Sequence, residues 1–163
     1  MILVTVGTHE QPFNRLVEYM DAWAGENSEK VVIQTGYSTY EPINCEWKKL
    51  FPYRDMIKNV DDARIVITHG GPSSYIMALQ VGKIPIVVPR KKEYDEHVNN
   101  HQVLFSNQVA ERQGNIIVVE DIKSLGDVIA GYDKTVSKMT NGLQSNNSKF
   151  CSEFEKIVNE LVK

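Results

Sequence analysis

Apolar residues along this chain gather in short runs that alternate with helically spaced stripes. Runs rich in Ile and Val occupy residues 2–6, 30–35, 65–67 and 116–119, which is typical of strands covered on both faces. After the first run, one apolar stripe repeats with the period of a helix: Phe13, Leu16, Val17, Met20 and Trp23. Strands that alternate with helices predict a parallel sheet with right-handed crossovers, a Rossmann-like, doubly wound α/β domain.

Weaker patterns predict the other elements of this domain. A short helix is expected at 55–62, a short strand near Leu50 and Phe51, a helix from about Tyr94 to Arg112, and a helix at 121–130. In the third of these, the spacing of Val98, Phe105 and Val109 marks an apolar stripe, with His101 and Gln102 beside it.

The last part of the chain has a different character. We expect the domain to occupy residues 1–132 and the remainder, 133–163, to hold a linker and a final helix. The linker candidate is the polar segment NGLQSNNS at 141–148. The helix is strongly amphipathic, through Phe150, Phe154, Ile157, Val158 and Leu161. Its apolar face either packs on the domain or docks on another subunit.

The stretch IVITHGGPSSYIMALQVGKIPIVVPR, residues 65–90, is the centre of the predicted fold. It predicts a strand, a glycine turn, a helix opened by Pro72 and stopped by Gly82, and a second strand. Ser73 and Ser74 lie where the amides of a helix N-terminus point outward, which suits an anion. Either a nucleotide diphosphate binds this turn, or the glycines simply permit tight strand-to-helix packing.

Ligands of doubly wound sheets bind beyond the carboxyl ends of the strands, where the strand order reverses. This rule places residues 7–9, 69–74 and 90–101 around one crevice. His97 and His101 would share a helical face there, and their spacing would permit two metal ligands. However, no carboxylate or Cys is placed to complete a site, so no metal is expected. Partly buried side chains such as His101 and Gln102 need polar partners, which a ligand can supply.

Composition narrows the possible functions. The chain has 163 residues, about one domain, and a net charge of −3 without a basic block, which argues against nucleic acid as a ligand. Two distant cysteines, Cys45 and Cys151, indicate a reducing compartment. No segment reaches the roughly 18 apolar residues of a membrane span, and no signal peptide precedes the first strand, so a cytoplasmic location is expected. Motifs for hydride transfer, ATP hydrolysis and α/β-hydrolase chemistry are missing.

Five segments, in this order and at these separations, resemble one glycosyltransferase family: VTVGTHEQPFNRLV, FPYRDM, ITHGG, GKIPIVVPR and EHVNNHQ. Over residues 1–132 the chain is similar to the nucleotide-sugar-binding half of GT-B enzymes, of the family 28 C-terminal type. It looks like the second subunit of bacterial capsule and exopolysaccharide β-1,4-galactosyltransferases and the catalytic subunit of the eukaryotic dolichol-linked N-acetylglucosaminyltransferase. More distantly it resembles the C-terminal domain of the peptidoglycan transferase that glycosylates lipid I.

The resemblance implies roles for residues of the predicted crevice. The diphosphate of a UDP-sugar would be held by the two turns, through Gly7, Thr8, His69, Gly70, Gly71, Ser73 and Ser74. Tyr53 and Met56 would line the uracil pocket, and Arg90 would offset negative charge. The transferred sugar would be read by His101 and Gln102, with Glu96 and His97 nearby. The donor is a substrate, and no cofactor or metal is implied. One position departs from the pattern, because Met77 stands where many relatives have a ribose-binding glutamate and cannot accept those hydrogen bonds.

The resemblance also implies a partner. A GT-B fold has two halves, and a chain of this length has room for one, so the lipid-linked saccharide acceptor would bind a separate membrane-anchored subunit. That subunit would hold this chain at the inner face of the membrane, and the amphipathic final helix is the candidate for docking to it.

We therefore expect an inverting subunit that transfers a hexose, galactose in the first instance, during surface polysaccharide synthesis. His9, in the first turn, is the candidate general base, with Glu96 as a second catalytic candidate; a base on the partner is the alternative. Two rival functions remain open. One is a UDP-sugar-binding module that activates its partner without chemistry of its own, and the other is a UDP-sugar epimerase or hydrolase that acts alone.

Overall fold

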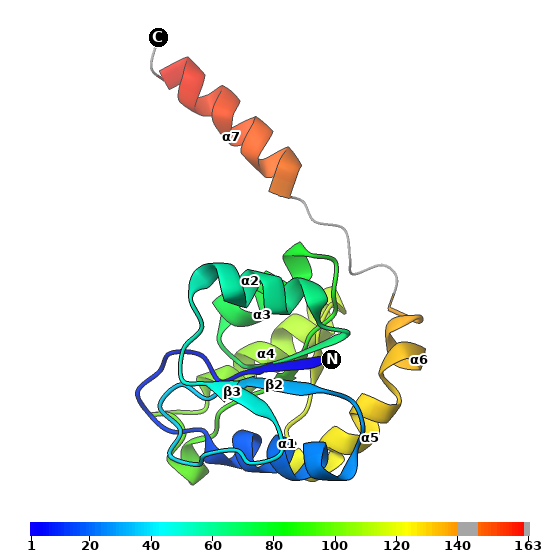
Figure 1. The fold of residues 1–163 in the computed structure, drawn as a ribbon. Helices are drawn as coiled ribbons and strands as arrows, with labels where there is room; N and C mark the ends of the chain where they lie inside the picture. Colours follow the sequence, from blue (N-terminus) through cyan, green and yellow to red (C-terminus); the bar gives the residue numbers. More distant parts are fainter. Residues whose placement is uncertain (140–146, 162–163) are drawn as a thin grey trace.

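Six parallel strands form one sheet at the centre of the molecule. The computed structural model describes residues 1–139 and 147–161 (Figure 1). The strand order is β3-β2-β1-β4-β5-β6, and every neighbouring pair is parallel. The strands are β1 (Ile2–Thr5), β2 (Val31–Gln34), β3 (Glu46–Lys48), β4 (Ile65–His69), β5 (Ile86–Val88) and β6 (Ile117–Val118).

The order of the strands reverses beside β1. The chain runs outward from β1 to β3, then returns to the other side of β1 with β4 and continues to β6. Ile2 is consequently in register with Val31 of β2 and with Ile65 of β4. The carboxyl ends of β1 and β4 therefore open side by side, and the loops that follow them diverge to opposite faces of the sheet.

Helices cover both faces of the sheet, as Figure 1 shows. On one face lie α1 (Asn14–Glu26), α5 (Leu125–Ala130) and α6 (Tyr132–Val136), and on the other α2 (Tyr53–Asp62), α3 (Pro72–Gln80) and α4 (His101–Gln113). Successive strand residues point to opposite faces, so Val4 and Ile67 pack under α1 while Leu3 and Val66 pack under α2. Both faces are buried, which is why the strands are continuous apolar runs. The Rossmann-like α/β prediction is confirmed.

Two predicted elements were placed wrongly. The helix expected from Tyr94 begins only at His101: a 3-10 turn, η1 (Lys92–Tyr94), ends at Asp95, whose φ of 55° is left-handed and incompatible with a helix. Val98 is thus outside α4 and exposed. The strand expected near Leu50 lies earlier, at β3. An edge strand with exposed side chains carries no apolar run that reveals it.

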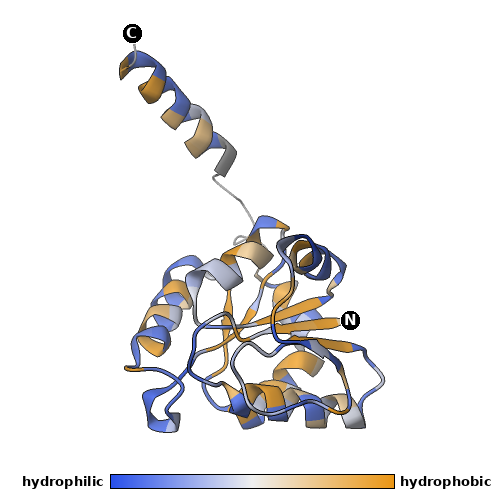
Figure 2. Ribbon diagram, turned by 60° about the vertical axis from the view of Figure 1, so that its left-hand side comes forward, coloured by the Kyte–Doolittle hydropathy of each residue, from blue (hydrophilic) through white to orange (hydrophobic). Residues whose placement is uncertain are grey.

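The other boundaries differ by smaller amounts. The helix expected at 121–130 is split into a 3-10 turn, η2 (Ile122–Ser124), and α5. The final helix is present as α7 (Asn147–Leu161), while the linker candidate lies largely outside the described residues. Figure 2 shows apolar residues gathered along α7, and all five predicted stripe residues are exposed. Within residues 1–139 and 147–161, no helix has both the length and the apolarity needed to cross a membrane.

Candidate functional site

A cleft of about 500 Å³ opens at the carboxyl ends of β1 and β4, where the strand order reverses. Eight of the residues predicted from the sequence line it: Gly7, Thr8, His9, Tyr53, Met56, His69, Ser73 and Ser74. Thr5, Gln34, Phe51, Val60, Val66 and Met77 complete the lining. Among the described residues that line the cleft, none is Asp, Glu, Lys or Arg. Any anion bound here must therefore be held by amides, hydroxyls and imidazoles.

The two glycine turns meet across the ring of His69. A Cβ atom added to either Gly7 or Gly71 would lie 2.3 Å from this ring, so neither position can hold a larger residue without displacing it. Gly7 also has a φ of +76°, which disfavours any side chain. Burial and the positive charge of Arg90 lower the pKa of His69 from 6.5 to about 4, so its ring is neutral at pH 7. The glycines thus serve tight packing, which was one of the two interpretations of this turn.

The polar end of the cleft is the start of α3. Pro72 occupies the first turn of this nine-residue helix, where its missing N–H costs nothing. Ser73 is exposed and Ser74 half-buried, and both border the cleft. The positive end of the helix dipole and two hydroxyl groups therefore face the same space, which favours a negatively charged ligand.

Apolar and aromatic side chains also line the cleft. They are Phe51, Tyr53, Met56 and Met77, and Tyr53 is 77% exposed. The segment that carries Phe51 is held by Gln34, whose amide group donates to Thr5 Oγ1 at 3.1 Å while its Oε1 accepts from the Phe51 N–H at 3.1 Å. Our sequence reasoning missed this glutamine. Gln34 is a polar residue at the end of an otherwise apolar strand, and this position could have indicated a role at the site.

Gln102 fastens the glycine turn to the exit of β5. Its side chain is 5% exposed, and its Oε1 accepts from the backbone N–H groups of Gly70 and Arg90, both at 3.1 Å. Two donors on the same atom decide which way the carboxamide points, so its NH₂ group faces away from them. A Cβ on Gly70 would lie 2.8 Å from Gln102 Cβ, which shows how closely the helix approaches the turn. This geometry gives Gln102 a positioning role.

Arg90 is fully buried, and its side chain is hydrogen-bonded to the main chain on both sides of the first turn. Its guanidinium donates to the backbone carbonyls of Val6 at 2.8 Å, Gln11 at 2.8 Å and Glu96 at 3.1 Å, and its centre lies 4.8 Å from the centroid of the Phe13 ring. Burial lowers the pKa of Arg90 to about 10, with Glu96 opposing the shift, so it stays charged. The guanidinium is directed at main-chain atoms, and Arg90 does not line the cleft where the resemblance implies charge compensation.

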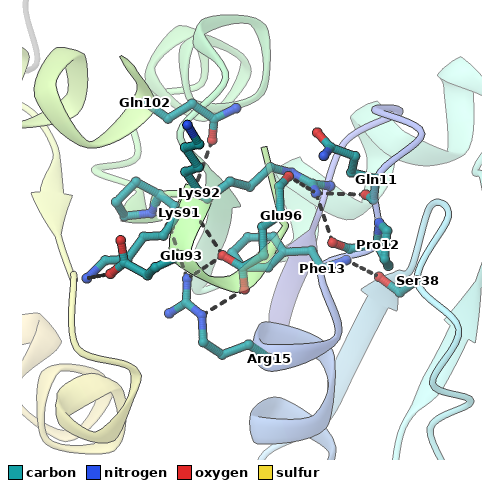
Figure 3. A network of polar contacts seen from close by, with 12 residues as sticks. Gln11, Pro12, Phe13, Arg15, Ser38, Lys91, Lys92, Glu93, Glu96 and Gln102 are labelled. Carbon is teal, nitrogen blue, oxygen red and sulfur yellow. Dashed lines mark hydrogen bonds and ion pairs between the residues drawn. The ribbon is translucent and has the colours of Figure 1, made fainter. Parts of the chain in front are cut away.

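Glu96 also supports the site from outside the cleft. Its carboxylate accepts two hydrogen bonds from Arg15, at 2.8 and 2.9 Å, and one from the Lys91 N–H at 2.9 Å (Figure 3). It is 3% exposed. Both carboxylate oxygens are thus engaged by other parts of the chain, and Glu96 is not among the residues that line the cleft. The prediction of a catalytic Glu96 therefore does not fit the structure.

Three histidines stand in a row beside the cleft. The ring of His97 lies 4.8 Å from that of His9 and 4.5 Å from that of His101, centroid to centroid. His97 precedes α4, so it does not share a helical face with His101 as predicted. Burial, reinforced by the neighbouring His101, His9 and Arg90, lowers the pKa of His97. His9 Nδ1 accepts from the Gln11 N–H at 3.2 Å, so the neutral ring carries its proton on Nε2. No cluster of His, Cys, Asp or Glu suited to a metal ion occurs among the described residues.

Comparison with known families identifies the domain. A model of the glycosyltransferase family 28 C-terminal domain matches residues 1–161. The chain belongs to this family. The family 28 domain is also 33% identical over 76 residues to the UDP-N-acetylglucosamine transferase subunit ALG13 of Yarrowia lipolytica, a match that covers 47% of this chain and 36% of the relative. The chain therefore aligns with about a third of that protein's length.

Solved structures place the family 28 domain in the glycosyltransferase fold. The calicheamicin glycosyltransferase CalG4 superposes with a TM-score of 0.60 at 16% identity, over 99% of this chain and 44% of CalG4. The glycosyltransferase of kitacinnamycin superposes with a TM-score of 0.55 at 18% identity, over 87% of this chain and 37% of that enzyme. In each case the chain matches one half of a two-domain GT-B architecture, which agrees with the half-domain predicted from the sequence.

Proposed function

We propose that this chain is the donor-binding subunit of an inverting glycosyltransferase that transfers a hexose from a UDP-sugar to a lipid-linked saccharide. The observation that carries the proposal is the composition of the cleft lining, which combines the start of α3 and its two serine hydroxyls with the aromatic side chains of Phe51 and Tyr53. A nucleoside diphosphate likewise combines an anionic pyrophosphate with an aromatic base. Membership of family 28 and the name of the Yarrowia relative support a UDP-linked donor.

The residues take their roles from this arrangement. The hydroxyls of Thr8, Ser73 and Ser74, with the amides at the start of α3, bind the diphosphate and stabilise the charge that develops on it when the sugar leaves. Tyr53 and Met56 contact the uracil. Gly70 and Gly71 form the backbone of the turn, so their contribution is its shape.

His9 acts as a hydrogen-bond donor in this proposal. Since Nδ1 already accepts from Gln11, Nε2–H is available to a diphosphate oxygen, and the general base for the acceptor hydroxyl comes from the partner subunit. His9→Gln keeps an N–H donor, and we expect it to retain most of the turnover of the reconstituted enzyme with an unchanged pH profile, whereas His9→Ala loses at least about tenfold. Equal losses in both variants, with the acid limb of the profile abolished, would restore His9 as the base.

The partner subunit would complete the cleft. The chain corresponds to less than half of each matched glycosyltransferase structure, which supports a second half that covers the donor and holds the lipid-linked end of the acceptor. The exposed apolar face of α7 is the proposed docking element, with Phe150 and Phe154 stacked at 5.9 Å. Such a subunit, anchored in the membrane, would place the reaction at the inner face during capsule or exopolysaccharide synthesis. A truncation that lacks α7 but still captures the partner would disprove the docking role.

Titration calorimetry of the chain tests donor binding. We expect UDP and UDP-sugars to bind and uridine to bind far more weakly, because it lacks the diphosphate. Ser73→Asp places a carboxylate at the polar end and should weaken UDP binding at least about tenfold. Ser28→Asp, also exposed but away from the cleft, is the matched control. Unchanged UDP affinity in Ser73→Asp would refute the diphosphate site. A comparison of the affinities for UDP-galactose and UDP-N-acetylglucosamine then identifies the sugar, which we propose to be galactose.

Met77 favours one alternative, a binding module that positions a UDP-sugar for its partner without contributing to chemistry. The described lining of the cleft holds no carboxylate to accept bonds from the ribose hydroxyls, so the donor is held less firmly. The reconstituted pair separates the two functions. Turnover at saturating donor that survives Ser73→Asp would favour the module, and turnover at saturating donor that falls would support the enzyme, because the loss is then in the chemical step.

A further inference from the structure

A second pocket, of about 450 Å³, lies beyond the end of β2, between the β2–β3 loop and the residues after β3. Its lining is rich in aromatic and apolar side chains framed by two charged ones: Tyr37, Tyr40, Glu41, Trp47, Lys49 and Leu50. No residue of this lining borders the first cleft. The two pockets are separated by main-chain atoms of Gly36, which lines the second pocket, and Gly7, which lines the first. A Cβ added to Gly36 would lie 2.7 Å from the carbonyl oxygen of Gly7. The second pocket thus neighbours the proposed diphosphate turn.

The loop that forms the second pocket is held in shape from α1. Asp21 is fully buried, and its carboxylate accepts from the N–H groups of Ile43 at 3.0 Å and Asn44 at 2.7 Å and from the Tyr40 hydroxyl at 2.8 Å. Burial raises the pKa of Asp21, but the bonds from Asn44, Ile43 and Tyr40 outweigh it, so the net pKa is lowered and the carboxylate stays ionised. A loop fixed by a buried charge keeps its cavity without a ligand.

A second anchor fixes the start of the same loop. Asn14 Oδ1 accepts from the N–H of Thr39 at 2.9 Å and of Tyr40 at 3.2 Å, and the Ser38 hydroxyl accepts from the Phe13 N–H at 3.1 Å. These bonds join the loop to the N-terminal end of α1. The pocket is therefore preorganised, which reduces the entropy that binding a ligand must overcome.

The aromatic residues of the pocket are available for contact although their polar tips are satisfied. Tyr40 donates to Asp21 and Trp47 Nε1 donates to the Pro42 carbonyl at 3.0 Å, so neither ring needs a ligand to pair its polar atom. Tyr37 is 57% exposed and Leu50 51% exposed. These two side chains therefore offer apolar surface to a ligand in the pocket.

We propose that this pocket binds a saccharide ring, and that it is a subsite for the acceptor. The C–H face of a pyranose packs on aromatic rings, while its hydroxyls need donors and acceptors at the edge, which Lys49 and Glu41 supply. A purely apolar ligand would leave those charges unused, and an anionic ligand would meet Glu41. The saccharide site stands by itself; its assignment to the acceptor rests on the proposed glycosyltransferase function.

Nuclear magnetic resonance of the full chain tests this site, with methyl β-glucoside, methyl β-galactoside and N-acetylglucosamine as probes. The chain has two indole N–H signals, from Trp23 and Trp47, and we expect the probes to shift that of Trp47 only. Tyr37→Ala should weaken saccharide binding about threefold or more, the scale of one aromatic contact, and Tyr37→Phe should preserve it. UDP affinity should be the same in both variants.

Tyr53→Ala, in the first cleft, is the reciprocal variant: it should weaken UDP and leave the Trp47 response to saccharides unchanged. A Trp47 signal that ignores all three saccharides, or that shifts equally in Tyr37→Ala, would overturn the saccharide site. Saccharide binding without UDP binding would instead overturn the donor proposal and support this pocket. Displacement of the saccharide by UDP would show one shared site and would refute two separate subsites.

Discussion

Replacing Gln102 with Leu would remove the acceptor on which the glycine turn depends. Two buried N–H groups, those of Gly70 and Arg90, would lose their partner, and each orphaned buried donor costs about 1–3 kcal/mol. Gln102→Leu should therefore lower the free energy of unfolding by about 2–6 kcal/mol, measured by urea denaturation. Because the freed turn also carries the diphosphate site, UDP affinity should fall at least about tenfold, measured by calorimetry.

Two further variants isolate the cause. Gln108 is an exposed residue of the same helix, so Gln108→Leu makes the same chemical change without a buried donor and should stay within about 0.5 kcal/mol. Gln102→Glu keeps an oxygen for both N–H groups but loses the NH₂ group. It should recover part of the stability that Gln102→Leu loses, because both N–H groups keep an acceptor while a buried charge limits the gain. Its carboxylate should weaken UDP binding by repulsion of the diphosphate.

The result that would refute this reasoning is a Gln102→Leu protein as stable as Gln108→Leu. The sequence-based expectation that Gln102 reads the sugar is tested with the same proteins. If the NH₂ group binds the hexose, Gln102→Glu will lower the affinity for UDP-sugars more than the affinity for UDP. If Gln102 only positions the turn, both ligands will respond alike.

Three further predictions concern the packing around the first turn. The pKa of His69 is about 4 in the folded chain and 6.5 in the unfolded chain, so the unfolded state binds more protons between these pH values. The free energy of unfolding should therefore fall by about 3 kcal/mol from pH 6.5 to pH 4. In His69→Phe this part of the loss should be absent from acid denaturation curves. Gly7→Ala adds a steric clash to backbone strain, so it should lower the free energy of unfolding more than Gly82→Ala does. At Gly82 φ is +74° but nothing lies within 4 Å of an added Cβ, so only about 1–2 kcal/mol is expected there. Equal melting temperatures of the two variants would contradict the clash at Gly7. Arg90→Met leaves buried carbonyls unpaired and should cost at least about 3 kcal/mol by the same assay, and a loss below about 1 kcal/mol would show that Arg90 does not hold the turn.

The sequence predicted the sheet well because burial on both faces produces continuous apolar runs such as Ile65 to Ile67. It predicted the cleft because the turns after β1 and β4 are marked by glycines and must meet at the reversal of strand order. The edge strand β3 was expected a few residues too late because it buries too little to need an apolar run that marks its position. These differences follow from what each element packs against.

The roles of polar side chains were harder to predict. Gln102, Arg90 and Glu96 lie next to the crevice in the sequence, and the family resemblance assigned them to the ligand. In the structure all three are nearly or fully buried and bind other parts of the chain. A one-dimensional pattern shows that a polar residue is near a site, but only the fold shows whether its partner is a ligand or a main-chain atom from a distant part of the sequence.

The side chains that shape both pockets bind mostly main-chain atoms. Arg90 holds carbonyls, Gln102 holds amides, and Asp21 holds the amides of Ile43 and Asn44. Main-chain atoms are the same whatever residue carries them. Loop residues that touch a ligand can therefore be exchanged during evolution or by design while the anchors preserve the path of the chain, which offers a route to new donors and acceptors on an unaltered scaffold.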